Sequence, residues 1–190
     1  RPEVTPNAPA EYRLFRAEGL TGTSFTQIAK INVNNSGNTA DTLFVDKGLN
    51  TEDLAYNYQL ELWTTQNGVL TKQDVSESAS SVRLGQGAAE PTMIKLDWTA
   101  NVPWSNASQT HRIFREDKAK PGSFNRIADV RVSGTNSFTY TDNGTDTYPT
   151  DGISNVTITK NESYCYKVET VGSYNDTKVK PALLYNFSQI

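Results

Sequence analysis

The chain contains 190 residues, a formal net charge of −3 and one cysteine. This length accommodates one large domain or two β-sandwiches of about 100 residues each. Lys and Arg are scattered singly, so the composition argues against a nucleic-acid-binding protein. It contains no run of about 18 apolar residues, which excludes a membrane-spanning helix, and a lone cysteine excludes an internal disulfide framework.

The first expected strand, at residues 12–16, opens an internal repeat. Its sequence YRLFR resembles HRIFR at residues 111–115, and FTQIAKI at residues 25–31 resembles FNRIADV at residues 124–130. Both matches have the same offset along the chain, and the first pair alternates polar and apolar side chains as half-buried strands do. We therefore predict two copies of one β-rich module.

Two later pairs of segments continue the repeat. LFVDKG at residues 43–48 corresponds to TYTDNG at residues 139–144, and YNYQLE at residues 56–61 corresponds to YCYKVE at residues 164–169. The offset is larger for the second of these pairs than for the first, so the second copy carries an insertion between them. Because the inserted residues are rich in Asp, Thr, Gly and Asn, we expect a longer surface loop there.

These segments together resemble the fibronectin type III pattern. IKLDW at residues 94–98 resembles its B strand, whose tryptophan is buried between the sheets, and HRIFR resembles its C strand. The resemblance implies that Tyr56 and Tyr164 form tyrosine corners, in which the hydroxyl bonds to nearby backbone. The expected fold class is all-β, with two tandem immunoglobulin-like (fibronectin type III-like) β-sandwiches.

The repeat also predicts the domain boundaries. The first module should span residues 1–86 and the second residues 87–190, joined by a short linker at residues 85–89. In the second module we expect the longer loop at about residues 145–162, with a short hairpin around residues 156–158.

One strand is expected to lie outside the first module as given. Trp98 precedes His111 in the second copy, and a counterpart at the same spacing before Tyr12 would fall before Arg1. The first module is therefore predicted to lack its A and B strands. Either the chain is part of a longer polypeptide, or another chain adds the strand, or residues 1–10 form an irregular substitute, which their prolines disfavour.

A narrower resemblance appears in the second copy. WTANVPWSN at residues 98–106, VGSY at residues 171–174 and NFSQ at residues 186–189 are similar to the segment before the C-terminal domain of gliding motility-associated proteins of the Bacteroidota. These are large proteins of the type IX secretion route, so the resemblance implies an extracellular or cell-surface location and a sorting domain after this segment. Asp41-Thr42-Leu43 resembles a Bacteroidota O-glycan site, which makes Thr42 the expected modified residue.

Few residues offer catalytic chemistry. His111 is the only histidine, and we interpret it as structural or surface-exposed rather than as a base in a nucleophile–base–orienting triad. Cys165 is interpreted as a buried or half-buried inert thiol, and the two residues are too few for a zinc site. We expect neither an enzyme nor a cofactor.

Carboxylates in the second copy raise a calcium alternative. Asp142, Asp146 and Asp151 lie in or beside the long loop, but their spacing departs from the Asp-x-Asp-x-Asp-Gly pattern. Asp142 also has an equivalent, Asp46, in the copy without that loop. We therefore interpret both aspartates as stabilising a turn, and we expect no metal.

Three functions remain open at this point. The first is a non-catalytic structural or spacer segment of a large bacterial cell-surface or secreted protein, in an adhesion or gliding-related context. The second is a glycan- or protein-binding module that uses the loop containing Trp104. The third is an accessory region of a secreted hydrolase. The corresponding partners are flanking domains of the same polypeptide, and surface glycans or other surface proteins for the second.

Overall fold

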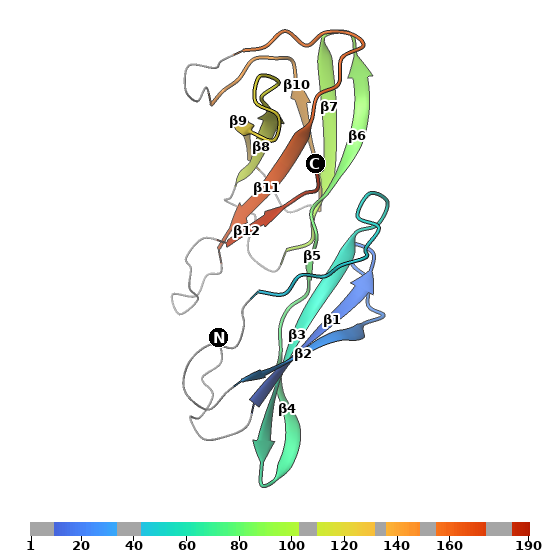
Figure 1. Cartoon of the computed structure of the whole chain (residues 1–190), viewed down its shortest axis with the longest axis vertical. Coiled ribbons are helices and arrows are strands. Elements are labelled where there is room, and N and C mark those ends of the chain that lie inside the picture. The colour runs from blue at the N-terminus through green and yellow to red at the C-terminus, as the bar shows by residue number, and fades with distance from the viewer. Residues whose placement is uncertain (1–9, 34–42, 103–109, 132–135, 149–154, 174–183) are drawn as a thin grey trace. The chain divides into compact units, whose positions relative to one another are not determined.

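The computed structural model describes residues 10–33, 43–102, 110–131, 136–148, 155–173 and 184–190. Within these ranges the chain is all-β, without helices, and its sheets are antiparallel (Figure 1). None of the described residues forms a helix that is long and apolar enough to cross a membrane. The chain divides into two compact units, residues 1–80 (unit 1) and residues 81–190 (unit 2).

The described part of unit 1 forms one sheet of five strands, in the order β2-β1-β3-β4 with β5 also paired to β3. The strands are β1 (Ala10–Glu18), β2 (Thr26–Val33), β3 (Tyr56–Gln66), β4 (Val69–Val75) and β5 (Ala79–Ser80). Residues directly opposite each other in neighbouring strands share a face of the sheet. The register therefore gives the sheet one mainly apolar face, which we call the inner face of unit 1 and which consists of Tyr12, Leu14, Ala29, Ile31, Leu60 and Leu62.

Unit 2 contains two sheets, ordered β10-β7-β6 and β12-β11-β8-β9. The strands are β6 (Arg83–Glu90), β7 (Met93–Thr99), β8 (Thr110–Glu116), β9 (Phe124–Arg131), β10 (Ser137–Asp142), β11 (Tyr166–Gly172) and β12 (Leu184–Phe187). Trp98 and Leu96 of β7 share a buried core with Ile113 of β8, Ile127 of β9 and Val168 of β11. Alternate residues of both sheets thus point into a common interior, and unit 2 is sandwich-like.

The two units share a backbone irregularity. In unit 1 the β1–β2 register shifts between Leu14 and Phe15, which leaves Ile28 as the extra residue. In unit 2 the β8–β9 register shifts between the equivalent residues Ile113 and Phe114, and the extra residue is Ile127. A β-bulge re-aims the side chains around it. The repeat in the sequence therefore extends to the same bulge at the same place.

The division between the units falls earlier than the expected boundary at residues 86 and 87. Residues 85–89, expected to be a linker, lie within β6, and β6 pairs with β7 of unit 2. The register shifts between Gln86 and Ala89, and a Cβ atom on Gly87 would lie 2.0 Å from the carbonyl oxygen of Lys95. Gly87 thus marks a bulge where two backbones approach closely, rather than a flexible joint.

Two segments differ between the units or from expectation. Residues 43–48 form no strand in unit 1, whereas in unit 2 the counterparts of residues 43–46 belong to β10, which pairs with β7. No described strand of unit 1 corresponds to β6 or β7. The hairpin expected around residues 156–158 is absent: Val156 N donates instead to Gly144 O at 2.8 Å, and Ile158 is buried.

Candidate functional site

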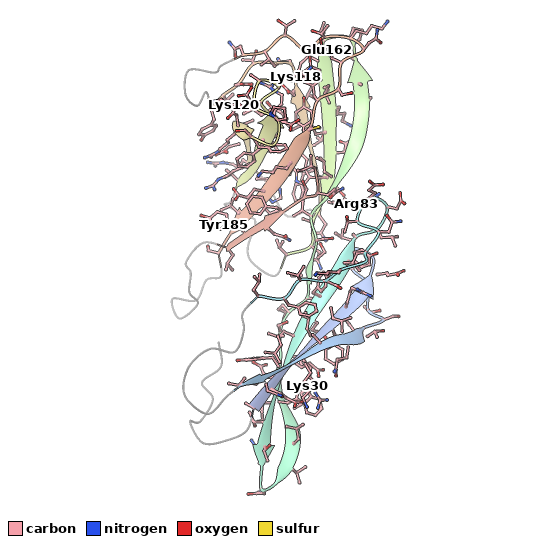
Figure 2. All side chains as sticks on the ribbon, viewed as in Figure 1. Lys30, Arg83, Lys118, Lys120, Glu162 and Tyr185 are labelled. Atoms are coloured by element: carbon pink, nitrogen blue, oxygen red, sulfur yellow. The ribbon has the colours of Figure 1, made fainter. Side chains whose placement is uncertain are left out.

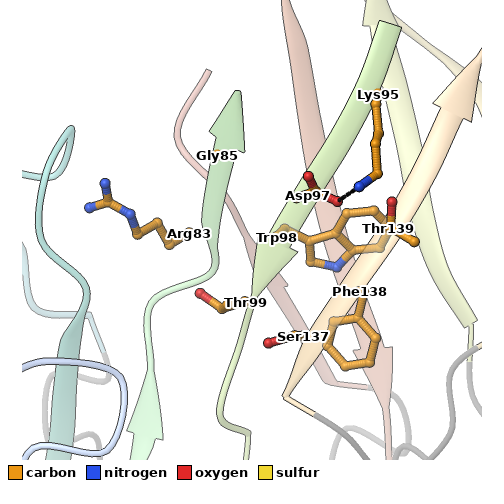
Figure 3. A pocket seen from close by; sticks show the side chains of 9 residues that line it. All are labelled: Arg83, Gly85, Lys95, Asp97, Trp98, Thr99, Ser137, Phe138 and Thr139. Atoms are coloured by element: carbon orange, nitrogen blue, oxygen red, sulfur yellow. Dashed lines mark ion pairs between the residues drawn. The ribbon is translucent and has the colours of Figure 1, made fainter. Parts of the chain in front are cut away.

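A shallow depression lies on the three-stranded sheet of unit 2 (Figure 3). It has a volume of about 490 Å³ and is lined by residues of β6, β7 and β10. Lys95 and Asp97 form an ion pair of 3.2 Å in its wall, and Gly85 contributes no side chain, which leaves the surface open. Hydrogen bonds from Thr139 and then Lys95 lower the pKa of Asp97, which makes this carboxylate a weaker base.

The most buried charges in unit 2 form a cluster at the end of β10. Arg115 donates from Nη1 to Asp142 Oδ2 at 2.7 Å and from Nη2 to both carboxylate oxygens of Asp146 at 2.8 and 2.9 Å. The Tyr166 hydroxyl donates to Asp142 Oδ2 at 2.8 Å, and the Gly144 amide donates to Asp142 Oδ1 at 2.8 Å. The side chain of Asp142 has no exposed area.

Unit 1 contains the same cluster with one carboxylate fewer. Arg16 donates from Nη1 to both carboxylate oxygens of Asp46, at 3.0 and 2.9 Å. The Tyr58 hydroxyl donates to Asp46 Oδ2 at 3.1 Å, and burial followed by this hydrogen bond raises the pKa of Tyr58 to about 12. We call each set an Arg–Asp–Tyr clamp, consisting of Arg16, Asp46 and Tyr58 in unit 1 and of Arg115, Asp142 and Tyr166 in unit 2.

The clamps join three separate parts of each unit. The arginine lies on β1 in unit 1 and on β8 in unit 2, and the tyrosine lies on β3 and on β11. The aspartate is the last residue of β10 in unit 2, whereas in unit 1 it belongs to no strand. Burial, then the charge of Asp142, raises the pKa of Tyr166, so the phenol stays protonated and donates. With every oxygen of Asp142 bonded, the clamp fixes the sheets and offers no free base.

The clamp also bears on the calcium alternative. The guanidinium of Arg115 occupies the space between Asp142 and Asp146 and satisfies both carboxylates, where an ion would need those oxygens itself. Asp142 does bond to the amide of the turn, as expected, and it also accepts a hydrogen bond of 2.7 Å from Arg115. Across the described residues no group of three His, Cys, Asp or Glu side chains is arranged to hold a metal ion.

His111 is fully buried in the core of unit 2. Its Nδ1 accepts a hydrogen bond from Trp98 Nε1 at 2.9 Å, so the neutral ring carries its proton on Nε2. Nε2 has no hydrogen-bond partner among the described residues, and the ring meets Phe138 edge-on at 4.5 Å between centroids. Burial lowers the pKa of His111 to about 4, which makes it a packing residue that is neutral at pH 7.

The other sequence-predicted residues lie apart from one another. The Tyr56 hydroxyl accepts a hydrogen bond from the Asn50 amide at 3.1 Å, and the Tyr164 hydroxyl accepts one from the Thr159 amide at 2.9 Å. The candidate ligand-contact residue Trp104 and the candidate glycosylation residue Thr42 both lie outside the described residues.

Cys165 departs from the expectation of a buried or half-buried thiol, because it is exposed. It precedes Tyr166 on the opposite face of the chain, and that face points outward here. Partial desolvation, then a hydrogen bond to Glu116, raises the pKa of its thiol, which disfavours the reactive thiolate.

A second depression, of about 300 Å³, lies beside the clamp of unit 2 and is lined in part by Arg115 and Asp146. At its rim Lys118 pairs with Glu162 and lies 3.8 Å from the centre of the Tyr164 ring, and Figure 2 shows Lys118 and Glu162 together at one end of unit 2. The lining also contains Glu116 and Asp117, so carboxylates outnumber cations in this depression.

The clamps were missed as clusters by reasoning from sequence. The signal was present, because the arginine, the aspartate and the tyrosine of the clamp are the same residue types in both copies. Arginine at an inward-facing position of an otherwise apolar strand face requires a buried partner. That requirement, applied to Arg16 and Arg115, would have pointed to Asp46 and Asp142.

No protein-family model matches the chain, and no curated protein is significantly similar to it.

Proposed function

We propose that this chain is a structural, non-catalytic segment of a large bacterial cell-surface or secreted protein, built from two tandem fibronectin type III-like modules. The single observation that carries the proposal is the duplicated clamp, together with the bulge that recurs at the equivalent place in the second copy. Because both copies contain the same clamp and the same bulge, we infer that the repeat is a structural module of defined shape.

The use of charge in the molecule supports a structural role. Enzymes hold titratable groups in a cleft, with pKa values matched to proton transfer. Here the acidic groups of the clamps are bonded to arginine, and the buried histidine accepts a hydrogen bond from a core tryptophan. These groups maintain the fold. The fold by itself does not identify a ligand.

Location and partners follow from the resemblance to the segment that precedes the C-terminal domain of gliding motility-associated proteins. On this proposal the modules lie outside the cell and connect flanking domains of the same polypeptide, and Thr42 carries an O-glycan. Trp104 lies outside the described residues, and we propose the spacer role because the described clamps of both units serve to hold the fold together.

Replacing the modules tests the spacer role directly. In the natural full-length protein, residues 10–190 would be exchanged for two unrelated β-sandwiches of similar length. The expected result is unchanged surface display, measured by protease treatment of intact cells, and unchanged activity of the flanking domains. Normal display with loss of adhesion or activity would contradict the proposal, because it would show that these modules bind a partner themselves.

A further inference from the structure

The dipeptide Asn-Gly occurs twice in the chain, at Asn67-Gly68 in unit 1 and at Asn143-Gly144 in unit 2. Both glycines have a positive φ, of 78° at Gly68 and 87° at Gly144. The backbone nitrogen of the following residue can attack the side-chain amide of an asparagine, and glycine leaves that nitrogen accessible because it has no Cβ. The two pairs share this intrinsic reactivity, so the fold decides which of them reacts.

In unit 2 the reacting groups are held in hydrogen bonds. The Gly144 amide donates to Asp142 Oδ1 at 2.8 Å, and Asn143 Oδ1 accepts from the Thr145 amide at 3.0 Å. Gly144 is buried, and its carbonyl oxygen accepts from Val156 N at 2.8 Å. Attack by the Gly144 nitrogen would first require breaking its bond to the aspartate of the clamp.

In unit 1 the same pair lies at the exposed tip of a hairpin. Asn67 and Gly68 join β3 to β4 with φ values of 50° and 78°, the two positive values of a type I′ turn. Both residues are exposed, and a Cβ atom on Gly68 would meet no heavy atom within 4 Å. Within the described part of the chain, neither the Asn67 side chain nor the Gly68 amide is hydrogen-bonded. All residues of β4 are exposed, so opening the tip uncovers little buried surface.

We propose that Asn67 is a site of spontaneous deamidation, which the fold suppresses at Asn143. The Gly68 nitrogen loses its proton to solvent base and attacks Asn67 Cγ. A C–N bond forms, and the side-chain nitrogen takes up a proton from water and leaves as ammonia. One water molecule then opens the succinimide ring at either carbonyl and gives aspartate or isoaspartate at position 67. The reaction consumes water, releases ammonia and does not rest on the spacer role.

The isoaspartate product changes the β3–β4 turn. In this product the main chain runs through the former side-chain carbon and is longer by one carbon before Gly68. The longer turn no longer fits the pairing of Gln66 with Val69 and of Thr65 with Leu70. Because β4 lies at the end of the sheet and pairs only with β3 among the described strands, it separates from the tip inward. The aspartate product keeps the turn, since aspartate also adopts positive φ.

The experiment follows both asparagines in the same protein. The purified chain is incubated in mildly alkaline buffer, and peptide mass spectrometry measures conversion at each site and separates isoaspartate from aspartate by fragmentation. We expect Asn67 to convert at least tenfold faster than Asn143 in the folded chain, and the two sites to convert at similar rates in urea. Equal rates in the folded chain would overturn the proposal, as would an Asn67 that converts only in urea.

The effect on the hairpin is measured by amide hydrogen exchange of Val69–Val75. Asn67→Asp is the matched variant, because it adds the same charge without lengthening the main chain. Exchange should be at least tenfold faster in the isoaspartate-containing protein than in the unmodified chain, and unchanged in Asn67→Asp. Equal exchange in all three proteins, or equally fast exchange in Asn67→Asp, would overturn the predicted change of the turn. These failures do not touch the spacer role, which module replacement tests separately.

Discussion

The two units are built from the same strands, yet they bury their charges to different extents. In unit 2 the side chains of Arg115 and Asp142 are 5% and 0% exposed, and in unit 1 those of Arg16 and Asp46 are 30% and 16% exposed. The bonds are alike, and among the described residues only unit 2 has a second sheet, which includes Asp142 of its clamp. The same three residue types therefore form a buried ion pair in unit 2 and a partly exposed ion pair in unit 1.

The largest expected effect comes from cutting the clamp in each unit. Arg115→Met leaves Asp142 and Asp146 without their cation in a buried setting, so unit 2 should lose about 3–5 kcal/mol of stability. Arg16→Met breaks a partly solvated pair and should cost unit 1 about 1 kcal/mol or less. Urea unfolding followed by NMR signals of β8 and β1 separates the two units, and equal losses would contradict the difference in burial.

Truncation of a core side chain should also destabilise unit 2 more than unit 1. Ile113→Ala removes a side chain with no exposed area and should destabilise unit 2 by about 2–5 kcal/mol, because a cavity remains. Leu14→Ala removes a half-buried side chain that already faces water, and we expect about 1 kcal/mol from the smaller area lost. Thermal unfolding measures both. A larger loss for Leu14→Ala would mean that the inner face of unit 1 is closed in solution.

Acid should weaken unit 2 through His111. Its pKa is lowered to about 4 in the folded protein, below the ordinary value of 6.5, so the unfolded chain binds the proton first. This contribution to stability is complete above pH 6.5, falls as the pH drops, and reaches a loss of about 3 kcal/mol near pH 4. Unit 1 has Tyr12 at this position and lacks the effect.

His111→Gln is the matched variant, because its side-chain oxygen can still accept from Trp98 and does not titrate. Denaturation midpoints for β8, measured between pH 7 and pH 4, should fall less steeply in His111→Gln than in the unmodified chain. An unchanged slope would show that other groups carry the acid sensitivity.

The smallest effects concern the tyrosine hydroxyls outside the clamps. Tyr56→Phe and Tyr164→Phe each remove a hydrogen bond to a backbone amide, from Asn50 and Thr159, and should cost about 1 kcal/mol. Urea midpoints should shift by similar amounts in the two units, since both bonds are local. A shift confined to Tyr164→Phe would show that the unit 1 bond does not persist in solution.

Much of the strand arrangement could be predicted from sequence because the repeat compares the chain with itself. The matches at residues 12–16 and 111–115 identified β1 and β8, and their common offset extends to the bulge at Ile28 and Ile127. The boundary could not be predicted, because Gly85 and Gly87 read equally well as a linker and as a bulge. Only the backbone of Lys95, contributed by a neighbouring strand, decides between them.

The clamps were missed for a different reason. Arg115, Asp142 and Tyr166 are distant in sequence and meet through tertiary packing, and a single aspartate before a glycine equally suits a turn. The exposure of Cys165 could not be predicted either, because alternation along a strand defines two faces but does not say which face is covered.

The central claim is that unit 2 has a closed core, whereas most inner-face residues in the described part of unit 1 are only half-buried. Amide hydrogen exchange of the unmodified chain, compared between β8–β11 and β1–β3, tests it most directly. The account predicts exchange in β1–β3 at least tenfold faster than in β8–β11 under native conditions, because opening unit 1 exposes less buried surface. Equal or stronger protection of β1–β3 would contradict it and would mean that the two units are closed to the same extent.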